Sequence, residues 1–185
     1  MTHPFARLSL ALCASAPLLS APAAAAPDAA PAWTLSANAG LASQYVSRGV
    51  RQSWGKPALQ AGVDAVHASG WSAGAWTSTI NGRFVENGRA EVDLYGGYSA
   101  AAGAIGYSAM LYLYRYPGAR SSATDTRYDY AEAMLGLSYR ALSLKYYRTV
   151  SADFFGITGA RGTGYLDLTL THELGAGVSA HLHLG

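Results

Sequence analysis

The chain has 185 residues, of which 50% are hydrophobic and only 13% are charged, and it contains 21 glycines and 13 tyrosines. So few charges beside so many glycines and tyrosines exclude an intrinsically disordered chain and argue against a helical bundle. The formal net charge of +2 gives no sign of a nucleic-acid partner.

Residues 1–26 have the pattern of a secretory signal peptide: one charge at Arg7, a short apolar stretch, and an alanine-rich segment with small-residue cleavage sites. The only cysteine, Cys13, lies in that apolar stretch, and Leu12 before it is larger than the residue that a lipoprotein site requires. We expect a cleaved leader, a Pro/Ala-rich tether at residues 27–32, and an exported mature chain without cysteine. No later run of about 18 apolar residues occurs, so no transmembrane helix is predicted.

Nine strand-like runs follow in the order of the chain. Each has the alternating side chains of a β-strand, none has a competing helical period, and most have about the ten residues that a tilted strand needs to cross a bilayer. Beyond the tether only Pro57 and Pro117 occur, both at the edges of loops, as a sheet requires. The predicted strands are residues 33–45, 58–68, 71–81, 90–100, 104–116, 128–140, 142–150, 162–173 and 178–185.

The fourth run raises the question of which face of the sheet is the inside. One of its faces carries Val92, Leu94 and Tyr98, and the other carries Glu91 and Asp93. A soluble barrel hides the apolar face in its core, whereas a membrane barrel turns it to lipid and keeps polar groups in the lumen. The alternation alone is compatible with both.

The connections between the runs favour the membrane barrel, because long and short ones alternate without exception. Outer-membrane barrels have tight periplasmic turns and extended outer loops. Aromatic residues near both ends of the runs agree with girdles at two membrane interfaces; alternatively, tyrosine simply favours strands. The expected girdles are Trp71, Tyr98, Tyr107 and Tyr139 near short turns, and Tyr45, Tyr116, Tyr128 and Tyr165 near long loops.

We therefore predict an all-β protein: an antiparallel up-and-down transmembrane β-barrel over residues 33–185, with its apolar face toward lipid. Bacterial single-chain barrels have even numbers of strands. Because nine strands are predicted, we expect that the sequence lacks the last strands of the barrel.

Two stretches, Gly40–Ser78 and residues 91–98, resemble a known family. They are similar to the TorF family of proteobacterial outer-membrane porins, also known as the Gcw_chp domain, and the resemblance extends over residues 33–185. It implies a pore of about twelve strands, within the usual range for such barrels, and it implies little about the solute. The residues that carry it are Ser43, Tyr45, Arg48, Gly49, Gln52, Ser53, Pro57, Gln60 and Asp64, then Glu91, Asp93, Tyr95, Gly97 and Tyr98.

Charged residues are divided between the predicted loops and strands. Most basic residues lie in or beside long loops, where they could hold lipopolysaccharide phosphates or attract anions, or form only a solvated surface. Acids prevail on the strand faces expected to line the lumen, where they could favour cations or form a satisfied network with Lys145, Tyr and Ser. The pore-lining candidates are Asp64, Glu91, Asp93, Tyr95, Tyr112, Glu132, Lys145 and Asp167.

The first long loop, residues 46–57, could fold inward and narrow the lumen. In that case Arg48 or Arg51 would pair with an acid of the wall. With Lys56, these arginines are the outer-loop or constriction candidates. Alternatively, the glycines of this loop only serve turns.

No catalytic, metal or cofactor site is predicted. His181 and His183 share a strand face, but no third metal ligand can be identified, and no Gly-x-Ser-x-Gly nucleophile motif occurs. We expect a passive diffusion pore for small hydrophilic solutes in the bacterial outer membrane, which meets outer-membrane lipids, lipopolysaccharide and the barrel-assembly machinery and could form a homo-oligomer. The alternatives are a non-conducting structural or surface-binding barrel and a secreted soluble barrel that carries an apolar ligand.

Overall fold

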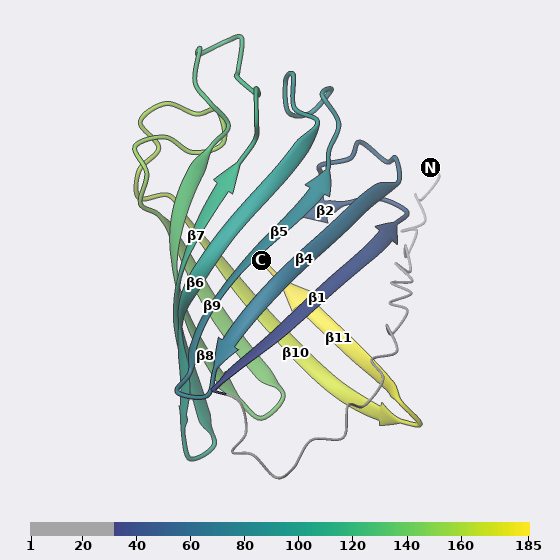
Figure 1. Ribbon diagram of the computed structural model, residues 1–185, viewed down its shortest axis with the longest axis vertical. Helices are drawn as coiled ribbons and strands as arrows, with labels where there is room; N and C mark the ends of the chain where they lie inside the picture. Colours follow the sequence, from purple (N-terminus) through teal and green to yellow (C-terminus); the bar gives the residue numbers. More distant parts are fainter. Residues whose placement is uncertain (1–31) are drawn as a thin grey trace, which may run out of the picture.

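The computed structural model describes residues 32–185 (Figure 1). The expected signal peptide, with Cys13, and the tether up to residue 31 lie outside the described residues. No helix within residues 32–185 is long and apolar enough to span a membrane.

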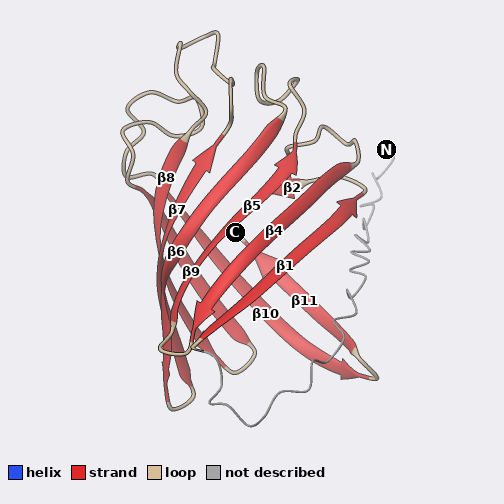
Figure 2. Cartoon of the chain, in the orientation of Figure 1, coloured by secondary structure: helices blue, strands red, loops and turns tan. Residues whose placement is uncertain are grey.

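All nine predicted strands are present and form one antiparallel sheet (Figure 1 and Figure 2). Each strand pairs with its neighbours along the chain, so the predicted all-β, up-and-down fold is confirmed. A separate two-stranded hairpin, which was not predicted, is formed by the segment that connects the first two strands of the sheet. The sheet contains β1 (Trp33–Ala42), β4 (Ala58–His67), β5 (Trp71–Thr79), β6 (Ala90–Ala102), β7 (Ile105–Arg115), β8 (Tyr130–Tyr139), β9 (Leu142–Thr149), β10 (Gly164–Gly175) and β11 (Val178–Leu184), and the hairpin contains β2 (Val46–Ser47) and β3 (Val50–Arg51).

Long and short connections alternate as predicted. The long loops, which follow β1, β5, β7 and β9, lie together at one end of the sheet, at the top of Figure 1. The short turns lie at the opposite end. We call these the loop end and the turn end.

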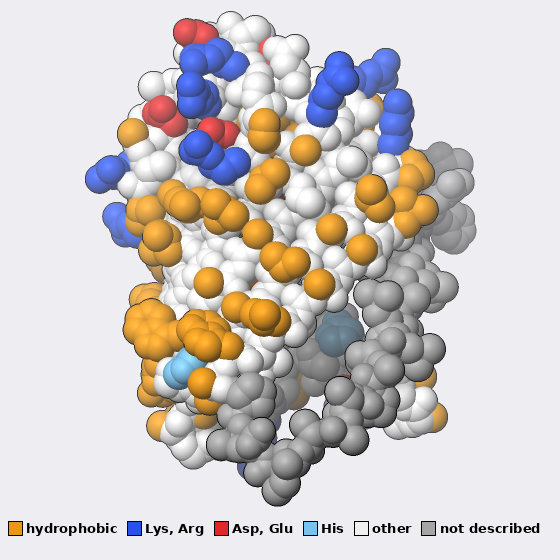
Figure 3. Space-filling view, in the orientation of Figure 1, with side chains coloured by type: hydrophobic (Ala, Val, Ile, Leu, Met, Phe, Trp, Pro, Cys, Tyr) orange, Lys and Arg blue, Asp and Glu red, His pale blue; other side chains and the backbone are white. Residues whose placement is uncertain are grey.

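The sheet has an apolar convex face and a polar concave face. On β7, Leu111 and Leu113 are exposed on the convex face, whereas Tyr112 between them is half-buried on the concave face. On β8, Leu135 is 64% exposed and Glu132 is 1% exposed. Figure 3 shows apolar side chains spread over the strands and most Lys and Arg side chains near the loop end.

The sheet curls strongly, so strands far apart in its order share one interior. Tyr45, Asp93, Tyr147 and His183, from both halves of the sheet, line a single cavity of ≈ 420 Å³. Within the described residues, β1 and β11 are the two edges of the sheet and no ladder joins them.

The buried apolar core lies in the long loops rather than between layers of the sheet. Val85, Tyr116, Ala119 and Tyr128 are at most 7% exposed, and Phe155 of the β9–β10 loop packs against them. The ring centroid of Phe155 lies 5.3 Å from that of Tyr116 and 5.1 Å from that of Tyr128, in edge-to-face geometry. We call these five residues the loop core, and they hold three long loops together.

The loop core corrects the expectation of an aromatic girdle at the loop end. Of the four tyrosines expected there, Tyr116 and Tyr128 are buried in the loop core, and Tyr45 and Tyr165 line the interior. Nearness to a loop does not determine the direction of a side chain, which follows from strand register and loop packing. Residues expected at the turn end are exposed on the convex face: Trp71, Tyr107 and Tyr139.

Candidate functional site

The β2–β3 hairpin carries Arg48 at its tip and directs its side chain into the interior. Arg48 and Gly49 have positive φ values of 49° and 78°, which is the backbone of a type I′ turn between antiparallel strands. Glycine adopts this conformation freely, but for another residue it costs about 1–2 kcal/mol. The contacts of the Arg48 side chain offset this cost.

Arg48 forms the central ion pair of the interior. Its guanidinium donates two hydrogen bonds to the Glu132 carboxylate on β8, with an Nη1–Oε1 distance of 2.9 Å and an Nη2–Oε2 distance of 2.5 Å. Its Cζ also lies 4.8 Å from the ring centroid of Tyr147 and 4.5 Å from that of Tyr165. Arg48 therefore connects the hairpin to β8, β9 and β10.

The environment of Arg48 keeps its guanidinium charged. Burial opposes the charge, but the hydrogen bonds and the negative charge of Glu132 outweigh burial, so the pKa of Arg48 is raised above its usual value. The two charges compensate each other inside the sheet.

Two further acids, Glu91 and Asp93 on β6, are buried near the hairpin; they are 2% and 9% exposed. Burial, followed by the negative charges of Glu91 and Asp93, raises the pKa of the Tyr45 phenol well above its usual range. Neither acid forms an ion pair with another residue of the 32–185 segment. Carboxyl groups therefore gather in the interior at the loop end, close to Arg48.

The remaining predicted pore-lining residues form separate contacts on the concave face. Tyr95 donates a hydrogen bond to Asp64 (2.6 Å between Oη and Oδ1), and Asp167 lies 2.9 Å from His183 Nε2. Lys145 lines a cavity of ≈ 310 Å³ and forms no ion pair among the residues that the structure describes. All eight pore-lining candidates thus face the interior, but they do not form one network. The ring of Tyr112 lies between two tilted neighbours there, with its centroid 5.7 Å from that of Tyr95 and 5.9 Å from that of Tyr147.

The structure separates the three constriction candidates. Arg48 folds inward and pairs with an acid of the wall, as one reading of the sequence expected. Arg51 and Lys56 do not, because both are exposed, and the Arg51 guanidinium lies 5.9 Å from the ring of Trp54 instead. The hairpin turn explains the difference, since it directs Arg48 at its tip into the interior and leaves Arg51 exposed.

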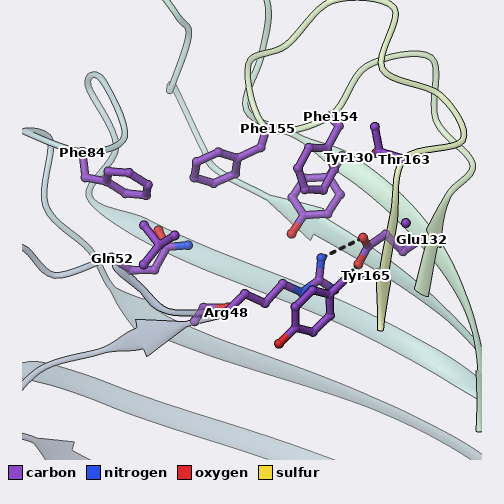
Figure 4. A pocket seen from close by; sticks show the side chains of 12 residues that line it. Arg48, Gln52, Phe84, Tyr130, Glu132, Phe154, Phe155, Thr163 and Tyr165 are labelled. Atoms are coloured by element: carbon purple, nitrogen blue, oxygen red, sulfur yellow. Dashed lines mark hydrogen bonds and ion pairs between the residues drawn. The ribbon is translucent and has the colours of Figure 1, made fainter. Parts of the chain in front are cut away.

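A pocket of ≈ 320 Å³ opens between the Arg48–Glu132 pair and the long loops (Figure 4). We call it the mouth pocket. Its walls are mainly aromatic, and its polar groups are the ion pair itself, the Gln52 carboxamide and the hydroxyls of nearby residues. The aromatic residues come from the β5–β6 loop, from β8, from the β9–β10 loop and from β10: Phe84, Tyr130, Phe154, Phe155 and Tyr165.

The phenylalanines of the mouth pocket were not predicted from the sequence. Phe155 and Gly156 have positive φ values of 48° and 79°, and Phe154 and Ile157 exchange two backbone hydrogen bonds around them. This is the same type of turn as the one at Arg48 and is unusual for a bulky residue. The sequence feature that could have indicated these phenylalanines is a pair of aromatic residues followed by a glycine in a long loop.

Comparison with protein families gives a match over residues 25–185 to Gcw_chp, which is described as a bacterial protein of unknown function. The chain belongs to the Gcw_chp family. Searches of the curated proteins and of the solved structures gave no match.

The description of Gcw_chp names no function, so the function has to be inferred from the chemistry of the site. This Gcw_chp interior offers a compensated ion pair, buried acids and aromatic rings. Within residues 32–185, no three or more His, Cys, Asp or Glu side chains are grouped so that they could hold a metal ion. The arrangement is suited to contacts with a polar solute.

Proposed function

We propose that this Gcw_chp chain is a TorF-type outer-membrane β-barrel that acts as a porin for the passive diffusion of small hydrophilic solutes. The observation that carries the proposal is the division of the sheet into an apolar convex face and a polar concave face. Each Leu or Val side chain left in water loses roughly 1.5–3 kcal/mol relative to burial, and the convex face bears many of them. A bilayer removes this penalty, as in other outer-membrane barrels.

In this proposal solutes move along the concave face and pass the Arg48–Glu132 pair near the loop end. Charge and aromatic rings then select solutes by size and polarity, and no bond is made or broken. The basic side chains at the loop end support an outward orientation of the long loops, where they contact lipopolysaccharide phosphates. The proposal also includes export by the signal peptide and insertion by the barrel-assembly machinery, with homo-oligomers as an option.

The second candidate is a non-conducting structural or surface-binding barrel in the same membrane. The loop core and the inward hairpin favour it, because the loop core packs the long loops together and the hairpin places Arg48 in the interior against Glu132. In that case, the side chains of the loops would contact a partner at the cell surface.

Planar-bilayer recording of the refolded full-length protein tests the proposal. We expect discrete conductance steps from protein that is folded, as judged by its β-sheet circular dichroism. Folded, inserted protein that stays electrically silent would favour the second candidate. Carbonate extraction of cell envelopes tests the membrane location: we expect the chain to stay in the pellet, and release into the supernatant would contradict it.

A further inference from the structure

We infer that the mouth pocket is a binding site for a small saccharide, whose ring stacks on the aromatic walls while its hydroxyls bond to the polar groups. The inference rests on the proposed function for the route by which a solute arrives. Binding itself does not require conduction, so the two can be tested separately.

The aromatic walls are held in place before any ligand arrives. The ring centroids of Tyr130 and Phe154 are 4.6 Å apart, and those of Phe84 and Phe155 are 5.5 Å apart. Phe155 is fixed by the loop core and by its tight turn. Aromatic faces carry partial negative charge and attract the C–H groups on the apolar face of a sugar ring, and preorganised walls lower the entropic cost of binding.

Gln52 supplies a hydrogen-bond acceptor without a partner. Its side chain lines the mouth pocket and is 6% exposed, and its Oε1 has no hydrogen-bond partner among the described residues. Its backbone is fixed, since its carbonyl accepts a hydrogen bond from the Asn81 amide at 3.0 Å. Buried polar atoms are nearly always hydrogen-bonded, so this oxygen favours a ligand that donates a hydrogen bond.

The charges of the pocket favour a neutral ligand. Arg48 and Glu132 compensate each other, which leaves no free charge for an ionic solute. A guanidinium has five N–H donors, and Glu132 engages two of them, so others remain for ligand hydroxyls. The volume of ≈ 320 Å³ is at the lower end of the usual range for ligand pockets and suits one or two sugar rings.

The test is a saturation-transfer NMR titration of the chain refolded in a detergent without a sugar head group. Maltose is the probe, and two further compounds are controls. Sorbitol has hydroxyl groups but no ring, and indole has a flat aromatic ring but no hydroxyl groups. We expect a saturable signal from maltose, the strongest transfer to its ring C–H protons, and no saturable signal from sorbitol.

Two variants connect the signal to the pocket. Phe154→Ala removes one aromatic wall and is expected to weaken maltose binding about tenfold. Gln52→Leu removes the unpartnered oxygen and should also weaken binding about tenfold without lowering the stability of the fold, because replacing an unsatisfied polar group by an apolar one does not destabilise. Ile157→Ala is the matched control, since Ile157 lies in the same turn with its side chain 57% exposed, and we expect unchanged binding.

The inference is overturned if the folded chain gives no saturable maltose signal, if sorbitol binds equally well, or if indole binds and maltose does not. It is also overturned if Phe154→Ala and Gln52→Leu both bind maltose as the parent does. A chain that conducts but fails these tests refutes the saccharide site alone. A chain that binds maltose but is silent in bilayers refutes the pore and leaves the site.

Discussion

Arg48 is the residue on which the loop end of the interior depends most. It occupies a backbone conformation that is unfavourable for a residue with a side chain, and its guanidinium pairs with Glu132, which is 1% exposed. Removing one partner of a buried ion pair destabilises a protein strongly because the other charge stays buried without compensation. The Arg48–Glu132 pair therefore connects the hairpin to the wall of the sheet and forms part of the mouth pocket.

We predict that Arg48→Ala lowers the free energy of unfolding by about 3 kcal/mol, the lower end of the range for a broken buried pair, because the Arg48 side chain is 22% exposed. Adding Glu132→Gln should recover most of this loss, since the uncharged amide costs less to bury. Urea titration of the refolded variants measures both effects.

Arg51→Ala is the control for this prediction. Arg51 lies in the same hairpin but is exposed and forms no ion pair among the described residues, so its replacement should change stability by less than about 0.5 kcal/mol. Equal losses from Arg48→Ala and Arg51→Ala would contradict the role given to the ion pair.

At the scale of elements, the long strands could be predicted from the sequence, and the short ones could not. Alternation over about ten residues marks a strand and its two faces, which is why the inward direction of Glu91, Asp93 and Glu132 was predicted. The strands β2 and β3 have two residues each, too few for any period. Their turn contains Arg-Gly rather than the usual Asn-Gly, so the hairpin gave no clear signal.

The candidate site was predicted only in part for the same reason. The alternation of side chains along a strand predicts the face of the sheet on which the acids lie. It cannot distinguish Arg48 from Arg51, because a tight turn determines which of the two reaches the interior. The mouth pocket depends on contacts between loops far apart in the chain, such as that of Phe84 with Phe155. Such contacts follow from the folded loop core and not from any local pattern.

Strand β9 provides a prediction about the two faces of the sheet. Leu144 is exposed on the convex face, so Leu144→Lys places a charge toward lipid in the proposed orientation and should destabilise the inserted protein by roughly 2–4 kcal/mol. Urea titration of protein folded into lipid vesicles measures the loss. The adjacent Ser143 lines the ≈ 310 Å³ cavity on the concave face, and Ser143→Lys should be tolerated. A larger loss from Ser143→Lys than from Leu144→Lys would refute the proposed orientation.

For the whole molecule, the proposed pore carries more acidic than basic side chains along its interior. Asp64, Glu91, Asp93, Glu132 and Asp167 lie on the concave face, whereas Lys145 and Arg48 are the basic candidates there. A surplus of acids in a lumen favours cations over anions.

We therefore predict that the open pore prefers cations. In planar bilayers with a gradient of KCl, the reversal potential should shift toward the equilibrium potential of K⁺. The shift should become smaller in Asp64→Asn, which removes one interior carboxylate. A reversal potential near the equilibrium potential of Cl⁻ would show that the basic loop end, rather than the interior, controls selectivity.

The central claim is that the convex face contacts lipid and the concave face contacts water, and site-directed spin labelling tests it most directly. Single cysteines would replace Leu113 and Leu135 on the convex face and Ser108 and Tyr112 on the concave face, in a chain whose Cys13 has been replaced. In lipid vesicles, the account predicts that oxygen, which dissolves in the bilayer, relaxes the labels at Leu113 and Leu135 most. A water-soluble nickel chelate should relax those at Ser108 and Tyr112. The reverse pattern, or equal access of the nickel chelate to all four labels, would contradict the account.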